Sequence, residues 1–230
     1  MRYLQTGVTL NNRDKATPGY TLFSPIGQFK TFLIDLEGEV AHEWEFPLPP
    51  GNYAYLQPNG NLLRASRTAE GPKGMSAKGG LLQEIDWDGN VVWEHTDHHQ
   101  HHDFTRLPNG NVIYTAWEPL SPEAVARVGG GLAGTDHGGE IYGDSFREVD
   151  ADGNIVWEWH VETDMEIEKF PICAICHRNE FAHANTVTYD KDGDIMFSQR
   201  HNHLVAVIDK ATKKLKWDMC DMKLFGHQHD

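Results

Sequence analysis

The sequence predicts an all-β protein, a β-propeller of four-stranded blades, and three observations support this. A turn signature rich in Asp, Asn and Gly occurs at residues 57–63, 107–113 and 190–196. A second Asp/Gly signature alternates with it, and its leading aspartates are residues 35, 86, 150 and 209, at intervals of 51, 64 and 59. Around each turn, apolar and polar residues alternate with the period of two that β-strands show. Units of this length with about four strands each are typical of propeller blades.

The elements follow from these signatures in chain order. Residues 20–45 supply about three strands of a first blade, and residues 53–217 supply three fuller blades. Asp-Gly and Asn-Gly pairs close the hairpins because they tolerate the positive φ of tight turns. The one candidate helix covers 122–127. In the third unit 43 residues separate Asp150 from Gly193, against 25 and 24 in the first two, so we expect an insertion of about 18 residues within 161–180.

We expect one domain, since 230 residues are ample for a single core. Residues 225–230 begin another unit, so the sequence predicts a propeller domain over 1–230 that is incomplete at its C-terminus. No apolar run approaches the ~20 residues of a membrane span. The N-terminal residues show no secretory signal, and three cysteines are too few for a disulfide scaffold, so we expect a cytoplasmic protein.

The charge of the chain restricts its partners. The formal net charge is −14 and the pI is about 5.4. So acidic a surface repels phosphate backbones, which makes nucleic acid an unlikely ligand class. An anionic substrate would therefore have to be received by a local basic pocket. The sequence makes no prediction of the oligomeric state.

Histidines recur just ahead of the turn signature. His101-His102-Asp103 precede its second copy and His183-Ala184-Asn185 its third, at equivalent positions if the longer turn supplies one residue of slack. Equivalent positions of a repeat protein lie on one face or ring, so these side chains should converge. Arg200 ends the strand after the third turn and suits an oxyanion. The candidate site residues are His101, His102, Asp103, His183, Asn185, Arg200 and His229. The alternatives are a solvated histidine-rich loop and a surface arginine.

The inserted segment contains a second motif, Cys173-Ala174-Ile175-Cys176-His177. It spells the haem c attachment pattern. Cys173, Cys176 and His177 could also supply three ligands of a zinc site. A disulfide that is labile or absent is the outcome we expect.

Taken in order, these motifs resemble the bacterial arylsulfotransferases that use an aryl sulfate as donor. The resemblance rests on the Asp-x-Asp-Gly-Asn-x-x-Trp turns, His-His-Asp before Leu-Pro-Asn-Gly-Asn, His-x-Asn followed by Ser-x-Arg, and the final Gln-His-Asp. It implies a six-bladed propeller with a central active site. It also implies ping-pong transfer of a sulfuryl group from a small aryl sulfate to a phenol through a sulfated histidine, without a metal or organic cofactor.

The same resemblance assigns roles to residues. It makes His229 the nucleophile, His183, Asn185 and Arg200 the sulfate-binding and acid/base residues, and His102 or His101 the remaining histidine. Three other functions stay open on the sequence. Converging histidines could hold copper, zinc or iron in a metal-dependent propeller enzyme. A quinone-dependent dehydrogenase and a non-catalytic binding scaffold are the others.

Overall fold

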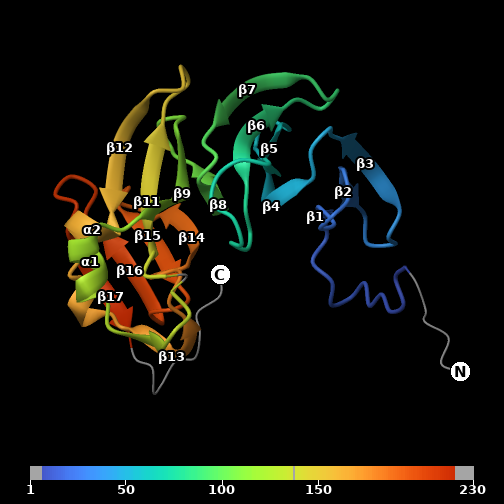
Figure 1. Cartoon of the computed structure of the whole chain (residues 1–230). Coiled ribbons are helices and arrows are strands. Elements are labelled where there is room, and N and C mark those ends of the chain that lie inside the picture. The colour runs from blue at the N-terminus through green and yellow to red at the C-terminus, as the bar shows by residue number, and fades with distance from the viewer. Residues whose placement is uncertain (1–6, 137, 221–230) are drawn as a thin grey trace, which may run out of the picture. The chain divides into compact units, whose positions relative to one another are not determined.

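The regular structure of the described residues is mostly antiparallel β-sheet (Figure 1). The computed structural model describes residues 7–136 and 138–220. They form two compact units. The first comprises the described residues up to 69 together with 79–96, and the second comprises 70–78 together with the described residues from 97 onward. None of the helices in the described ranges has the length and hydrophobicity of a membrane span.

The first unit contains two antiparallel sheets. Its strands are β1 (Thr21–Phe23), β2 (Lys30–Ile34) and β3 (Val40–Glu45) in one sheet, and β4 (Pro50–Leu56), β5 (Leu62–Arg67), β6 (Gly80–Ile85) and β7 (Val91–Thr96) in the other. Within each sheet, each strand pairs with the next along the chain. Leu33, Trp44, Leu62 and Ile85 form the buried core between them. The predicted three strands before residue 46 and the first full blade are confirmed.

The second unit contains two more four-stranded meanders. They are β8 (Gln100–Arg106), β9 (Val112–Pro119), β11 (Tyr142–Val149) and β12 (Ile155–His160), followed by β14 (Ala184–Tyr189), β15 (Ile195–Gln199), β16 (Leu204–Ile208) and β17 (Leu215–Cys220). The remaining elements are α1 (Pro122–Arg127), β10 (Gly130–Leu132), α2 (Val161–Asp164), η1 (Ile167–Lys169) and β13 (Ile172–His177). A large apolar cluster that includes Phe146, Trp159 and Phe197 fills this unit.

Two excursions interrupt the meanders of the second unit. Between β9 and β11 lies α1, whose N-cap residue Ser121 accepts a hydrogen bond from the N–H of Ala124 (3.1 Å). The helix has the bounds that the sequence predicts. Between β12 and β14, the expected insertion at 161–180 forms α2, η1 and β13, and β13 pairs in parallel with β10. The two excursions are therefore held together by a small sheet of their own.

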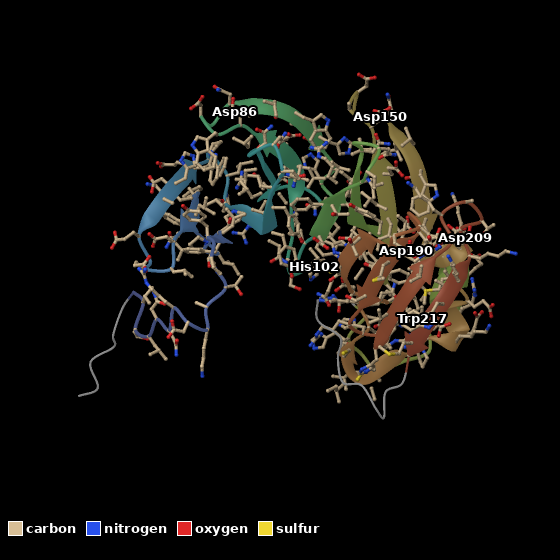
Figure 2. All side chains as sticks on the ribbon, turned by 180° about the vertical axis from the view of Figure 1, so that it is seen from behind. Asp86, His102, Asp150, Asp190, Asp209 and Trp217 are labelled. Atoms are coloured by element: carbon tan, nitrogen blue, oxygen red, sulfur yellow. The ribbon has the colours of Figure 1, made fainter. Side chains whose placement is uncertain are left out.

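An aspartate at the start of several hairpin turns fixes the turn through its carboxylate. Asp86 Oδ1 accepts hydrogen bonds from the backbone N–H groups two and four residues on (3.0 and 2.8 Å). Asp150 and Asp190 make the same pair of bonds, and Figure 2 shows these aspartates at their turns. Gly89 follows in the left-handed region (φ 92°), which glycine adopts without strain. Local hydrogen bonding therefore explains why the Asp/Gly pattern recurs.

Two tryptophans each connect one blade to the turn of the next. In the first unit, Trp44 Nε1 donates to the carbonyl of Asp86 (3.0 Å). In the second unit, Trp157 Nε1 donates to the carbonyl of Lys210 (2.9 Å). In both cases the acceptor lies in the last hairpin turn of the following meander. These two tryptophans, which lie nine and seven residues after the leading aspartates Asp35 and Asp150, thus join successive blades at their turns.

Candidate active site

The first strands of the two meanders in the second unit, β8 and β14, lie next to each other, and each carries a bulge. Pairing of β8 with β9 skips His102 and Asp103, and pairing of β14 with β15 skips Asn185. His102 (φ 40°) and His183 (φ 58°) both have the left-handed backbone that residues with a side chain seldom adopt. Such strained positions cluster at functional sites. The rings of His102 and His183 meet edge to face, with centroids 4.6 Å apart.

The expectation that a longer turn aligns these histidines is wrong. The N–H of Leu107 bonds the carbonyl of Asn111, and the N–H of Asp190 bonds the carbonyl of Asp194, so the two turns have equal length. The bulges shift the register the other way, because β8 skips two residues and β14 skips one. The position that corresponds to His183 is His99, since its carbonyl accepts from the N–H of Trp117 as the carbonyl of His183 accepts from the N–H of Arg200. A bulge inserts residues without changing the turn, so counting back from the turn glycine cannot locate it.

His183 forms a buried ion pair with Glu180. Its Nδ1 lies 2.6 Å from Glu180 Oε2, and the two side chains are 9% and 5% exposed. Burial acts to lower the pKa of His183, but the negative charge of Glu180 and the hydrogen bond to it outweigh burial and raise that pKa. The pKa of Glu180 lies well below its usual range; burial acts to raise it, and the positive charge of His183 overcomes this. Near neutral pH the pair is therefore charged.

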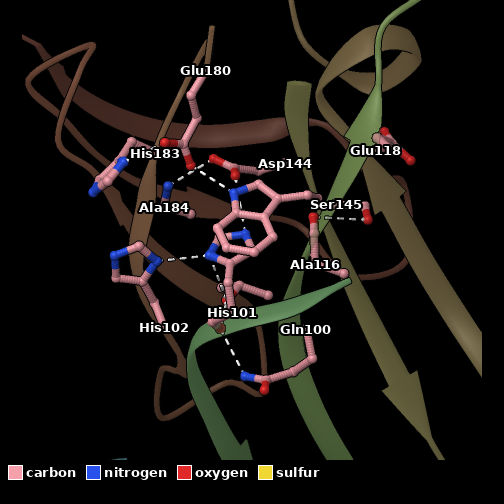
Figure 3. A network of polar contacts seen from close by, with 12 residues as sticks. Gln100, His101, His102, Ala116, Glu118, Asp144, Ser145, Glu180, His183 and Ala184 are labelled. Atoms are coloured by element: carbon pink, nitrogen blue, oxygen red, sulfur yellow. Dashed lines mark hydrogen bonds and ion pairs between the residues drawn. The ribbon is translucent and has the colours of Figure 1, made fainter. Parts of the chain in front are cut away.

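A second histidine pair approaches from β8. The Nδ1 atoms of His101 and His102 are 2.8 Å apart, and Nε2 of His101 lies 3.2 Å from Asp144 Oδ1 (Figure 3). His101 and Asp144 are fully buried. Asp144 is held in place because its Oδ2 accepts from the N–H of Ala184 (2.7 Å). A carboxylate beside Nε2 favours the tautomer of His101 that is protonated there, so its Nδ1 accepts a hydrogen bond from the Nδ1–H of His102.

Trp117 contacts both the His183–Glu180 pair and the His101–His102 pair. Its indole stacks on the His101 ring, with centroids 4.3 Å apart and an interplanar angle of 14°. The same indole donates from Nε1 to Glu180 Oε1 (2.6 Å). Trp117 is completely buried. One rigid side chain therefore sets the positions of His101 and Glu180 together.

His201 stacks on the other side of His183, with centroids 4.6 Å apart. It donates from Nδ1 to the carbonyl of Glu180 (3.0 Å). Burial and the neighbouring charge of His183 lower the pKa of His201 to about 4. His201 is therefore neutral near pH 7 and leaves the positive charge on His183.

A pocket of about 320 Å³ opens at this cluster, lined by Glu180, His183, Arg200, His201 and Cys176 among others. The guanidinium of Arg200 forms no ion pair with any described residue, and its charge acts to lower the pKa of both His183 and His201.

The amide of Asn185 is 1% exposed, and neither its Oδ1 nor its Nδ2 has a hydrogen-bond partner in the described part of the chain. Buried amides are normally satisfied, so this one suits a ligand.

Asp103 has a structural contact. Its Oδ2 accepts from the backbone N–H of Val187 (2.9 Å), which joins β8 to β14. The side chain is 3% exposed and lies outside the residues that line the pocket. Its position assigns it to holding the two bulged strands together, which is a different task from the substrate binding expected from sequence.

We expect Asp103→Ala to destabilise the fold by about 1.5–3 kcal/mol, because it removes a charge-assisted hydrogen bond and leaves a buried N–H without its acceptor. The free energy of unfolding in urea measures this. Asp88→Ala, at an exposed turn position, is the matched control and should change stability by less than about 0.5 kcal/mol. Equal stabilities for the two variants would contradict the structural role.

The cysteine motif lies at one wall of the pocket. Cys176 and His177 line it, and Cys173 lies behind them on β13. Cys173 and Cys176 are free thiols that hydrogen-bond each other. Burial, with the neighbouring Cys173, raises the pKa of Cys176 to about 11. In the described part of the chain, Cys173, Cys176 and His177 do not bring three ligand atoms within 4.8 Å of one another, as a zinc site requires.

Sequence reasoning missed four residues of the cluster: Trp117, Asp144, Glu180 and His201. The available signals were weak, since Glu180 follows the polar run His177-Arg178-Asn179 and Asp144 stands between Gly143 and Ser145 in a strand. The expected nucleophile His229 lies outside the described residues.

The electrostatics of the pocket favour an anion. The donor atoms of Glu180, His183 and His201 lie within 4.8 Å of one another, a grouping that could in principle hold a metal ion. Glu180 is already neutralised by His183, and the charge of Arg200 adds to the pocket. A dication would meet this positive charge, whereas a sulfate or sulfuryl group would be attracted by it. The cluster therefore supports anion chemistry over the metal-dependent alternative.

A model of the arylsulfotransferase (ASST) family matches residues 27–229. The chain belongs to this family. No curated protein matches the chain significantly.

Solved structures show the same fold. The chain is similar to a Bacteroides caccae protein of unknown function (14% identity, TM-score 0.51), covering 89% of this chain and 58% of that one. It is also similar to a streptogramin B lyase (15%, 0.50, covering 91% and 56%) and to the WD40 β-propeller domain of Doa1 (11%, 0.50, covering 90% and 52%). At these identities the likeness concerns the fold alone, and it confirms the predicted β-propeller class. The arylsulfotransferase chain spans somewhat over half the length of these three structures.

Proposed function

We propose that this arylsulfotransferase transfers a sulfuryl group from an aryl sulfate to a phenol through a sulfated histidine. The observation that carries the proposal is the pocket in which Arg200, without an ion-pair partner among the described residues, lies beside the charged imidazole of His183. Two residues after His183, Asn185 has a buried amide with no hydrogen-bond partner in the described part of the chain. Arginine suits several sulfuryl oxygens at once. The family supplies the reaction class.

In the proposed reaction, an imidazole nitrogen of His229 attacks sulfur and forms an N–S bond while the bond from sulfur to the aryl oxygen breaks. The imidazolium of His183 gives its proton to the departing aryl oxygen and becomes neutral. Arg200 and Asn185 donate hydrogen bonds to the sulfuryl oxygens. In the second half, a phenol oxygen attacks the same sulfur, its proton passes to His183, and the N–S bond breaks. Each cycle returns both histidines to their starting states.

The test is a double-displacement experiment. The protein, mixed with a chromogenic aryl sulfate alone, should release about one equivalent of phenolate in a burst, and its intact mass should rise by one sulfuryl group. A phenol added later should remove that group and appear as the new aryl sulfate. Release of inorganic sulfate at a rate that phenols do not alter would indicate a hydrolase and would overturn the proposal.

Arg200 should contribute to binding the sulfuryl group. We expect Arg200→Gln to weaken binding of inorganic sulfate and to raise the KM for the donor by about 10- to 100-fold, because hydrogen bonds from a charged donor are worth about 1.5–3 kcal/mol. Titration calorimetry with sulfate measures the first effect and initial rates the second. Arg127→Gln, at an exposed surface pair with Glu168, is the control and should change neither. Sulfate binding unaffected by Arg200→Gln would place the anion elsewhere.

A further inference from the structure

Glu180 is a buried carboxylate to which the proposed reaction gives no role. Both of its oxygens are engaged within the site, Oε2 with His183 Nδ1 and Oε1 with Trp117 Nε1, each at 2.6 Å. The side chain is 5% exposed. A carboxylate buried to this degree is costly unless its contacts compensate. Its two contacts are an imidazole of the site and the indole that supports the other imidazole pair.

The two contacts fix the geometry of His183. Because Nδ1 of His183 is bonded to the carboxylate, Nε2 is the nitrogen left to meet a substrate. Trp117 prevents the carboxylate from turning away, since its indole is buried and stacked on His101. The arrangement parallels the general rule that a catalytic histidine is oriented by a carboxylate on its other nitrogen.

We propose that Glu180, held by Trp117, is the positioning residue for His183: it orients Nε2 toward the pocket and keeps the ring protonated until the aryl oxygen departs. This inference rests on the proposed function. Glu180 touches no reacting atom and acts through His183. Its carboxylate stays ionised throughout the cycle and balances the imidazolium.

Other charged or titratable groups also face His183, and they do not replace Glu180. They are Asp144 on β11, His102 on β8, and Arg200 and His201 after β15. Asp144 acts to raise the pKa of His183 from a distance, while its own oxygens are directed at Ala184 and His101. Arg200 acts to lower that pKa. Without Glu180, burial and Arg200 would favour the neutral ring.

The test is Glu180→Gln, which keeps the shape of the side chain and removes its charge. Imidazole nitrogen NMR should show the pKa of His183 falling, because the charge of Glu180 and its hydrogen bond to Nδ1 no longer favour the protonated ring. The alkaline limb of the rate against pH should move down with it, so that kcat at mildly alkaline pH falls by about 100-fold while activity partly returns at acidic pH. Glu180→Asp should restore much of the alkaline limb. Trp117→Phe, which keeps the stacking and removes the hydrogen bond, should shift the limb by a smaller amount.

The chain offers a matched control in His160 and Glu118. Their Nδ1 and Oε2 atoms are 2.7 Å apart on β12 and β9, and neither residue lines the pocket. Glu118→Gln should lower the pKa of His160 and leave the pKa of His183 and the rate profile unchanged.

A folded Glu180→Gln protein with an unaltered pKa of His183 would overturn the inference. If Glu180→Gln fails to fold, Trp117→Phe with an unaltered rate profile would overturn it equally. Failure of the proposed function would appear instead as absence of transfer by the unmodified protein, and the NMR titration would still report how Glu180 acts on His183.

Discussion

Replacing His229 with alanine is expected to abolish transfer from an aryl sulfate to a phenol and to leave no sulfuryl group on the protein. The proposed route passes through an N–S bond to this residue, so without it no covalent intermediate can form. Removing the nucleophile of a covalent mechanism lowers kcat by about 10⁴-fold or more. Quenching the protein after exposure to a radiolabelled aryl sulfate, and measuring the label retained, tests this directly.

His227 provides the matched control, since it lies two residues earlier in the same segment. His227→Ala should retain the label and transfer it to a phenol at nearly the unmodified rate. Should His229→Ala keep its label, the nucleophile is another residue. A protein that transfers the sulfuryl group without ever retaining it would argue for direct transfer within a ternary complex.

The fold could be predicted from the sequence where contacts between residues close in the chain determine it. The aspartates at 86, 150 and 190 each close their turns with two hydrogen bonds to their own backbone, and those contacts require only the few residues that carry the signature. Helix α1 was visible for the same reason, because Ser121 and Pro122 supply a cap and a first residue suited to a helix start. Pairing of β10 with β13 was not visible, since it joins two excursions of irregular sequence about forty residues apart.

The candidate active site could be predicted from the sequence only in part. His102 and His183 were expected to converge because repeats bring equivalent strands together, and their rings do lie in contact. Trp117 and Glu180 have no repeat partners. They come from the end of β9 and from the segment after β13, and their hydrogen bond spans sixty-three residues. Contacts of this kind depend on how the segments between the strands pack. The sequence repeats carry no information about that packing.

His183→Asn is expected to lower kcat by about 10²- to 10⁴-fold, because it removes the proton donor of the first half-reaction and the proton acceptor of the second. Asparagine is the appropriate replacement since it tolerates the left-handed backbone at this position (φ 58°) better than alanine does. The substitution also leaves the buried carboxylate of Glu180 without its ion-pair partner, so the variant should be less stable, and its rates are compared under conditions in which circular dichroism shows it folded. Initial rates with a series of aryl sulfates provide the measurement.

The series of aryl sulfates also distinguishes a residue that donates a proton from one whose role is only structural. A phenolate that leaves readily needs little help from an acid, whereas a basic phenolate depends on it strongly. The loss in His183→Asn should consequently grow as the pKa of the leaving phenol rises, and the alkaline limb of its rate profile should disappear. His160→Asn, in the half-buried pair with Glu118 outside the pocket, should show neither effect. A loss of the same size for every leaving group would mean that His183 binds the sulfuryl group and that the proton comes from elsewhere, with the His101–His102 pair as the next donor to test.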